Sequence, residues 1–358
     1  MKKRSFAWSV LGVGVLLTGT GSRVSSAVEP DQGTNLLYVC NQGAATISVI
    51  DMDRNIVVKT IDLQALGLPA ESKPHHVQVE PDGSYYYVSL IGANTVLKFD
   101  RSDELVGRAE FEVPGLLQLD VHSDRLYVGR SMAAVNPPHR IGVIDRVNMT
   151  IEEVDVFYAR PHALAVARDG ATIYSASLAE NRMASIDAEA EQVELLTLEG
   201  PLHTLVQFAI SPNGRTMVAG GQMSGQLLVF SLENPAAPRV VRTIPVNAQP
   251  WHPTFTHDGR YVYIGNQEAS TITVIDARSW TVAKVLEGNG IAQPHGTAVS
   301  PDGATVYVSN KNLRGEYTGR GGTEVGTVVA IDVATQSVKA IIETGKGSAG
   351  ISTRAWRP

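Results

Sequence analysis

One short pattern recurs along this chain and constrains its fold more than any other feature. Each copy is an alternating apolar and polar run, a turn dipeptide such as Asp302-Gly303, and a second alternating run. The copies are KPHHVQVEPDGSYYYVS (73–89), RPHALAVARDGATIYSAS (160–177), HTLVQFAISPNGRTMVAG (203–220), QPWHPTFTHDGRYVYIGN (249–266) and QPHGTAVSPDGATVYVSNKN (293–312). Alternation around an Asp-Gly or Asn-Gly turn predicts a β-hairpin, because these dipeptides accept the positive φ angles of a tight turn.

The spacing of the hairpins predicts a β-propeller. Units of roughly 40–50 residues with about four strands each are the signature of propeller blades. Six units begin at about residues 74, 115, 161, 201, 250 and 293. A seventh, at 36–63, lacks its first strand, and GKGSAGISTRAW (345–356) matches that missing piece. We therefore expect an all-β, seven-bladed propeller of four-stranded antiparallel blades, its ring closed by the C-terminal strand in the first blade.

The first 27 residues are predicted to be a secretory signal peptide. Basic residues at positions 2–4 precede an apolar run (6–17) that is too short to span a bilayer, and Ser25-Ser26-Ala27 offers small residues for cleavage. We expect residues 28–358 to form the propeller, and the protein to be periplasmic or secreted with no membrane span.

Composition and motifs exclude several classes of function. The formal net charge is −6, which disfavours nucleic acid as a partner. Cys40 is the only cysteine, so there is no CxxCH for covalent haem and no cysteine-based metal spacing. The GRGG at 319–322 lacks the strand–loop–helix context of a nucleotide-binding loop, and no GxSxG elbow is present.

Four hairpins end in related tetrapeptides, YVCN (38–41), YVSL (87–90), YVGR (127–130) and YVSN (307–310). With their PDG turns, they resemble the YVTN-repeat family of secreted seven-bladed propellers. The resemblance covers essentially the whole chain after the leader. It implies the fold and a secreted location but no particular activity, because such propellers carry many unrelated functions.

Histidines recur where the innermost strand of a blade is expected to begin. The chain has nine histidines, and six of them lie at these positions: His75, His76, His162, His203, His252 and His295. Innermost strands line the channel of a propeller, so we expect the six imidazoles to converge on one mouth of it. Duplication of a single ancestral repeat also explains the recurrence, and in that case the imidazoles serve only to join blades.

Several histidines without a nearby carboxylate or thiolate favour a copper site. The His75-His76 pair, GPLHT (200–204) and QPHG (293–296) are similar to histidine segments of nitrous oxide reductase, whose propeller holds a multi-copper cluster. This chain lacks the second copper domain of that family. The sequence predicts a transition-metal site, copper favoured, with redox chemistry as a possible use, and metal binding that weakens below about pH 6.5. The alternative is a non-enzymatic propeller that binds a periplasmic protein or a small-molecule ligand.

Two long loops are expected on the same face as the histidines, at 131–140 and 311–326. Long loops on a rigid scaffold often carry function. The residues expected to cover the mouth or hold an anionic ligand are His139, Arg314, Tyr317, Arg320 and Glu324. A plainly mobile Gly-rich loop is the alternative.

Overall fold

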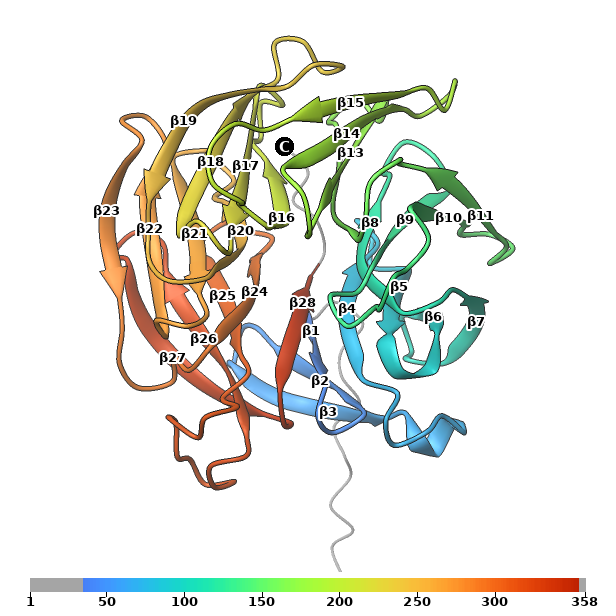
Figure 1. Ribbon diagram of the computed structural model, residues 1–358. Helices are drawn as coiled ribbons and strands as arrows, with labels where there is room; N and C mark the ends of the chain where they lie inside the picture. The colour runs from blue at the N-terminus through green and yellow to red at the C-terminus, as the bar shows by residue number, and fades with distance from the viewer. Residues whose placement is uncertain (1–34, 354–358) are drawn as a thin grey trace, which may run out of the picture. The chain divides into compact units, whose positions relative to one another are not determined.

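The computed structural model describes residues 35–353, which form seven four-stranded antiparallel sheets arranged as a ring (Figure 1). The predicted fold class is confirmed. The signal peptide predicted for residues 1–27 lies outside the described residues. Among the described residues, no helix has the length and hydropathy needed to cross a bilayer.

Each blade runs from an innermost strand at the central axis to an outermost strand at the rim (Figure 1). The first blade consists of β28 (Ser348–Ser352), β1 (Leu36–Asn41), β2 (Thr46–Asp51) and β3 (Ile56–Asp62). The second consists of β4 (Pro74–Val79), β5 (Tyr85–Leu90), β6 (Thr95–Asp100) and β7 (Leu105–Glu110). The third consists of β8 (Pro114–Leu119), β9 (Arg125–Arg130), β10 (Arg140–Asp145) and β11 (Ile151–Asp155). The fourth and fifth are β12 (Pro161–Val166), β13 (Thr172–Ser177), β14 (Arg182–Asp187) and β15 (Val193–Thr197); and β16 (Leu205–Ile210), β17 (Thr216–Gly221), β18 (Gln226–Ser231) and β19 (Arg239–Pro245).

The last two blades are β20 (Pro250–Phe255), β21 (Tyr261–Asn266), β22 (Thr271–Asp276) and β23 (Thr281–Leu286); and β24 (Pro294–Val299), β25 (Thr305–Asn310), β26 (Gly326–Asp332) and β27 (Ser337–Thr344). Two 3-10 turns, η1 (Gln64–Leu66) and η2 (Ile91–Ala93), complete the regular elements.

The ring is closed as predicted, by strands from both ends of the chain. In the first blade β28 pairs antiparallel with β1, with Val39 opposite Ile351 and Tyr38 opposite Ser352. All five residues of β28 are buried. Closure pairs the inner edge of β1, which the chain would otherwise leave open.

The core lies between neighbouring blades, where apolar side chains of adjacent sheets interleave. Between the first two blades the ring of Tyr86 stacks on Tyr38 at 4.3 Å and on Phe99 at 4.9 Å, between ring centroids. Cys40 is fully buried in the same cluster. Burial raises the pKa of its thiol, so Cys40 stays protonated and is a core residue.

The start of every innermost strand has the same local geometry. The residue just before it has a positive φ angle in each of the seven blades: Lys73, Val113, Arg160, Thr204, Gln249, Gln293 and Gly347. The carbonyl of that residue accepts a hydrogen bond from the first residue after the second strand, as in Ile91 N to Lys73 O at 3.2 Å. Each innermost strand also has a bulge or irregularity in its pairing with the second strand.

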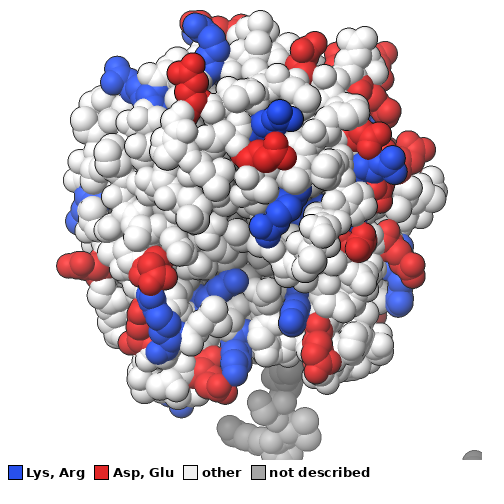
Figure 2. All heavy atoms as spheres, viewed as in Figure 1, with Lys and Arg blue, Asp and Glu red and all other residues white. Residues whose placement is uncertain are grey.

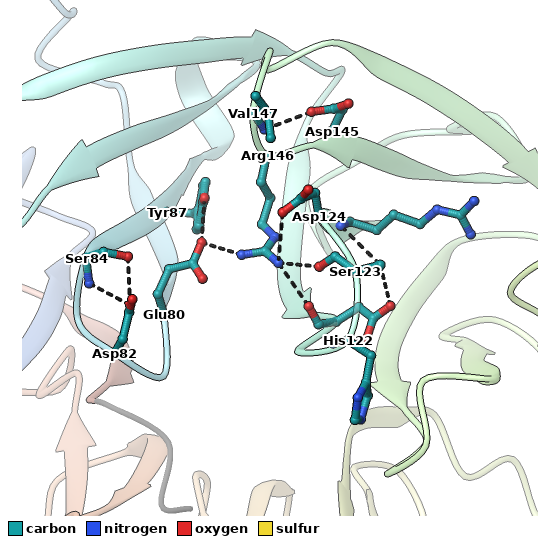
Figure 3. A network of polar contacts seen from close by, with 12 residues as sticks. Glu80, Asp82, Ser84, Tyr87, His122, Ser123, Asp124, Asp145, Arg146 and Val147 are labelled. Carbon is teal, nitrogen blue, oxygen red and sulfur yellow. Dashed lines mark hydrogen bonds and ion pairs between the residues drawn. The ribbon is translucent and has the colours of Figure 1, made fainter.

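The opposite end of the channel is a separate, open region. A cavity of about 390 Å³ lies there, lined by the later residues of the innermost strands, such as Gln118 and Thr254. Beside it, Arg146 forms an ion pair with Glu80 of the neighbouring blade and donates to the carbonyl of Asp120 at 3.1 Å (Figure 3). His122 lies in the same region, as Figure 3 shows.

Charge is distributed without a dominant patch on the face shown in Figure 2, where basic and acidic side chains are interspersed among uncharged ones. That face has no contiguous basic surface of the kind that binds a polyanion.

Candidate functional site

The bulge at the start of the innermost strands places two consecutive side chains of a strand in the buried region at the channel mouth. His75 and His76 are both about 5% exposed, and the pairing of β4 with β5 shifts between Pro74 and His76. Trp251 and His252 are likewise both buried at the irregular start of β20. In a regular strand consecutive side chains point to opposite faces, whereas the extra residue of a bulge lets two consecutive side chains lie on the same side.

Four imidazoles from three blades form a continuous cluster at this mouth. The ring centroids of His252 and His295 are 4.7 Å apart, those of His75 and His295 are 5.3 Å apart, and those of His76 and His252 are 6.1 Å apart. The Trp251 ring lies 4.7 Å from His295. Residues separated by up to 220 positions in sequence are therefore neighbours here.

His162 belongs to the same group through its electrostatic effect. Burial is the main cause of the lowered pKa of His75, His76 and His252, and the charge that His162 would carry when protonated lowers it further. Its Nδ1 lies 2.6 Å from the carbonyl oxygen of Arg130, so Nδ1 carries the proton and donates it. The Nε2 atom of His162 is then an unprotonated acceptor.

The ring nitrogens of this cluster are largely without hydrogen-bond partners. Among the described residues, His76 is held by the backbone N–H of Leu117, which donates to its Nδ1 at 3.2 Å. Within the part of the chain that the structure describes, five other buried ring nitrogens have no partner: Nδ1 of His75, Nε2 of His162, Nε2 of His252, and both nitrogens of His295. Buried polar atoms normally have a protein, water or ion partner, so these nitrogens make this mouth the candidate site.

Burial keeps these imidazoles neutral. Loss of solvation lowers the pKa of His76 to about 3 and of His162 to about 4. The same cause lowers the pKa of His75, His252 and His295 well below the ordinary value, with the Lys311 charge adding to the effect on each. Neutral imidazoles can donate a lone pair to a metal. Protons are therefore expected to compete with a metal ion for these nitrogens only well below pH 6.5, the value predicted from the sequence alone.

His203, the sixth predicted member, does not join the cluster. Its Nδ1 lies 3.0 Å from the hydroxyl of Ser224 and its Nε2 lies 3.0 Å from the carbonyl of Glu199. The other histidines follow the positive-φ residue of their blade, whereas His203 precedes Thr204. The two places at which the other blades carry these histidines, second and third after the positive-φ residue, are occupied in the fifth blade by Val206 and Gln207.

The long β25–β26 loop is tied down by its own contacts. Arg314 pairs with Glu268 at 2.9 Å and with Glu316 at 2.7 Å. Three more contacts involve predicted residues: Tyr317 Oη donates to Glu343 at 3.1 Å, the backbone N–H of Arg320 donates to Glu343 at 2.8 Å, and Glu324 pairs with Lys346 at 2.7 Å. In the β9–β10 loop His139 is exposed. Most of these predicted ligand-holding groups already have protein partners.

Sequence reasoning missed Lys311, which directly follows β25. Lys311 is partly buried, and its Nζ lies 5.7 Å from the centroid of the Trp251 ring. Burial lowers its pKa to about 8. The available signal was positional. Six blades have an uncharged residue at this place after the second strand, namely Gln42, Ile91, Ser131, Leu178, Gln222 and Gln267.

Within residues 35–353, no three His, Cys, Asp or Glu side chains are placed so that together they could hold a metal ion. The rings of His75, His76, His252 and His295 are nevertheless close to one another. Two imidazoles on one tetrahedral ion, each with its nitrogen at about 2.0–2.1 Å from the metal, have ring centroids about 5 Å apart. The observed centroid separations of 4.7–6.1 Å span that value.

Comparisons with known proteins agree with the architecture. A family model described as "Lactonase, 7-bladed beta-propeller" matches residues 203–283. No curated protein matches the chain at a significant level.

Three solved structures have a similar fold. Hydrazine synthase of Kuenenia stuttgartiensis has a TM-score of 0.64 at 18% identity, over 77% of this chain and 88% of that one. The dihydro-heme d1 dehydrogenase NirN, in complex with DHE, has a TM-score of 0.62 at 14% identity, over 89% and 75% of the two chains. A putative 6-phosphogluconolactonase of Bacteroides fragilis has a TM-score of 0.67 at 13% identity, over 91% and 99%. At these identities the similarity concerns the fold alone, and this chain is a seven-bladed β-propeller.

Proposed function

We propose that the protein binds a transition metal, copper favoured, through the imidazoles of His75, His76, His162, His252 and His295. The observation that carries the proposal is the set of five buried ring nitrogens without partners, gathered at one mouth of the channel. The lowered pKa values support it, because a neutral imidazole is the form that ligates.

The residues fit such an ion in their chemistry. His162 donates Nδ1–H to a backbone carbonyl and leaves Nε2 free, which is the usual second-shell arrangement of a metal-binding histidine. No carboxylate or thiolate is among the ligands, and an all-imidazole set suits copper. His295, with two unpartnered nitrogens, needs to break no hydrogen bond in order to rotate.

Bound copper would supply one-electron redox chemistry. The chain's own contribution would be to hold the imidazoles neutral, to fix their backbone positions on closed blades, and to exclude water from the site. The resemblance to secreted YVTN-repeat propellers and the predicted leader support a periplasmic or secreted location for this function.

The alternative is a propeller that binds a protein or small-molecule ligand and whose imidazoles only join blades. The absence of a ready trio of ligands in the described part of the chain favours this alternative. The two readings differ in whether the free protein takes up metal.

Metal uptake by purified protein tests the proposal. The protein is stripped with a chelator, titrated with Cu²⁺, Cu⁺ and Zn²⁺, and assayed by calorimetry and elemental analysis. Copper is expected to bind tightly to the parent protein. Binding is expected to be lost in the H75A/H76A double variant, because two adjacent ligands are removed.

Two control variants sharpen the test. H122A removes a histidine at the opposite end of the channel, where its Nε2 lies 2.8 Å from the carbonyl oxygen of Arg168 beside the cavity. H203A removes a histidine whose ring nitrogens are already engaged. Both should bind copper as the parent does. The metal proposal is wrong if the parent takes up no more copper or zinc than the double variant, and the binding-propeller alternative then stands.

A further inference from the structure

The channel mouth that contains the five clustered histidines carries positive charge without a matching negative group. Lys311 forms no ion pair among the described residues, and its charge lowers the pKa of His75, His252 and His295. Arg160 also forms no ion pair there and lowers the pKa of His162. No carboxylate is among the groups that shift the pKa of these four histidines. Two cations therefore flank neutral rings in a poorly solvated site, an arrangement that calls for an anion.

Unpaired hydrogen-bond donors lie beside Lys311. The indole Nε1–H of Trp251 is buried without an acceptor. His295 has no partner at either ring nitrogen, and a neutral imidazole always carries one N–H. The Lys311 Nζ lies 5.7 Å from the Trp251 ring centroid, and that ring lies 4.7 Å from the His295 ring. The Lys311 ammonium, the Trp251 ring and the His295 ring are thus neighbours, and none of their N–H groups has an acceptor among residues 35–353.

We propose that this mouth binds a small anion, a carboxylate or an inorganic oxyanion, held by the Lys311 ammonium and by the N–H groups of Trp251 and His295. The ion must be small because Trp251 is only 6% exposed and His295 is fully buried. It reaches them past Lys311, the partly exposed member of the three. Charge-assisted hydrogen bonds to the ammonium supply most of the affinity.

This anion site deepens the proposed function but does not require it. With metal bound to neutral imidazoles the mouth becomes more positive, and an anion is needed all the more. Without metal, the donors and the ammonium remain. Anion binding and metal binding can therefore be measured separately.

The test follows the indole N–H of Trp251 by NMR in ¹⁵N-tryptophan protein stripped of metal. Sodium gluconate, too large for the site, is replaced by sodium formate or sodium nitrite at constant ionic strength. A saturable shift of the Trp251 signal, assigned with W251F, is expected for both probes, while the Trp280 signal stays in place.

Variants assign the binding to Lys311. K311Q and K311M should bind formate about tenfold more weakly or worse, and K311R should restore binding because it keeps the charge. K346Q is the matched control, since Lys346 pairs with Glu324 on the same face. Thermal melting and circular dichroism identify variants that do not fold, and K311R then decides the assignment alone.

The outcomes separate this inference from the metal proposal. If Trp251 shows no saturable shift, or if folded K311Q and K311M bind formate as the parent does, the anion site is refuted. Copper uptake without anion binding refutes this inference only, whereas anion binding without copper uptake refutes the metal proposal only.

Discussion

At the scale of single residues, the environment of the histidines decides what they can do. Burial costs a protonated imidazole its hydration, so His76 and His162 stay neutral far below the pH at which free imidazole is protonated. The Lys311 charge acts in the same direction on His295. The same loss of solvation that makes these groups good ligands is expected to make the folded protein sensitive to acid.

The stability of the metal-free protein is therefore expected to fall as the pH drops below about 6.5. The unfolded chain takes up protons on its histidines near that pH, whereas folded His162 does so only at about pH 4. Each such histidine contributes about 1.4 kcal/mol of unfolding free energy per pH unit in that window, lost as the pH falls. Urea unfolding at pH 6.5 and pH 5.0 measures the slope.

A comparison of variants isolates the contribution of one ring. Between pH 6.5 and pH 5.0 the free energy of unfolding should fall by about 2 kcal/mol less in H162Q than in the parent. The reason is that the variant lacks an imidazole that takes up a proton in the unfolded chain but not in the folded protein. H122Q, which replaces an exposed ring, is the control substitution. Equal slopes in the parent and H162Q would show that His162 does not stay neutral in the folded state.

At the scale of elements, a positive-φ residue before each innermost strand fixes where that strand begins, at a cost in backbone strain. The positive-φ residue turns the chain inward, and its carbonyl is held by the end of the second strand, as in Ser131 N to Val113 O at 2.8 Å. Six blades use a residue with a side chain there, and only the first uses glycine, at Gly347. This geometry sets the positions of His75, His162 and His295, each of which lies two residues after the positive-φ residue.

Replacing Val113 by Gly is expected to stabilise the protein. Val113 has φ 47°, a conformation that costs a β-branched residue about 1–2 kcal/mol. Its backbone N–H and carbonyl keep their bonds to Asn94 and Ser131 in the variant. After the entropy cost of glycine, a gain of about 0.5–1 kcal/mol should appear in urea unfolding.

Val121 offers a matched control, because it is exposed, lies at the opposite end of the same strand, and is not a positive-φ residue. V121G should lose about 0.5–1 kcal/mol through the added freedom of the unfolded chain. If V113G is destabilised as much as V121G, the strain at Val113 is not real.

At the scale of the whole molecule, one strand makes the ring continuous. β28 pairs with β1 and also contacts the blades on both sides. The hydroxyl of Ser352 accepts from Val79 N in the second blade at 3.2 Å, and Ser309 in the seventh blade donates to the carbonyl of Ala349. These contacts join β28 to the second and seventh blades, so the ring closes only when this C-terminal strand is in place.

Deleting residues 348–358 should therefore open the ring. The loss of buried Ile351 and its neighbours, with the exposed edge of β1, is expected to cost at least about 3 kcal/mol and to promote aggregation. Deleting only 354–358, which follow β28, is the control. Soluble yield and thermal melting are the measurements, and unchanged melting after the larger deletion would argue against closure by β28.

The sequence by itself determined the fold. The hairpins, the blade length and the split first blade all follow from near neighbours, since alternation and turn chemistry act over a few residues. The seven blades and the closing strand were predictable for that reason. The place of five histidines at one mouth followed from the repeat as well.

Only the tertiary structure decided what surrounds those histidines. His203 shares the Pro-His spacing, yet it precedes the strand start and bonds to Ser224 and Glu199 instead of joining the cluster. Lys311 looks like one more loop lysine, until the ring of blades brings Trp251 and His295 beside it. The physical reason is that solvation and charge at a point depend on groups from several blades, which no local pattern specifies.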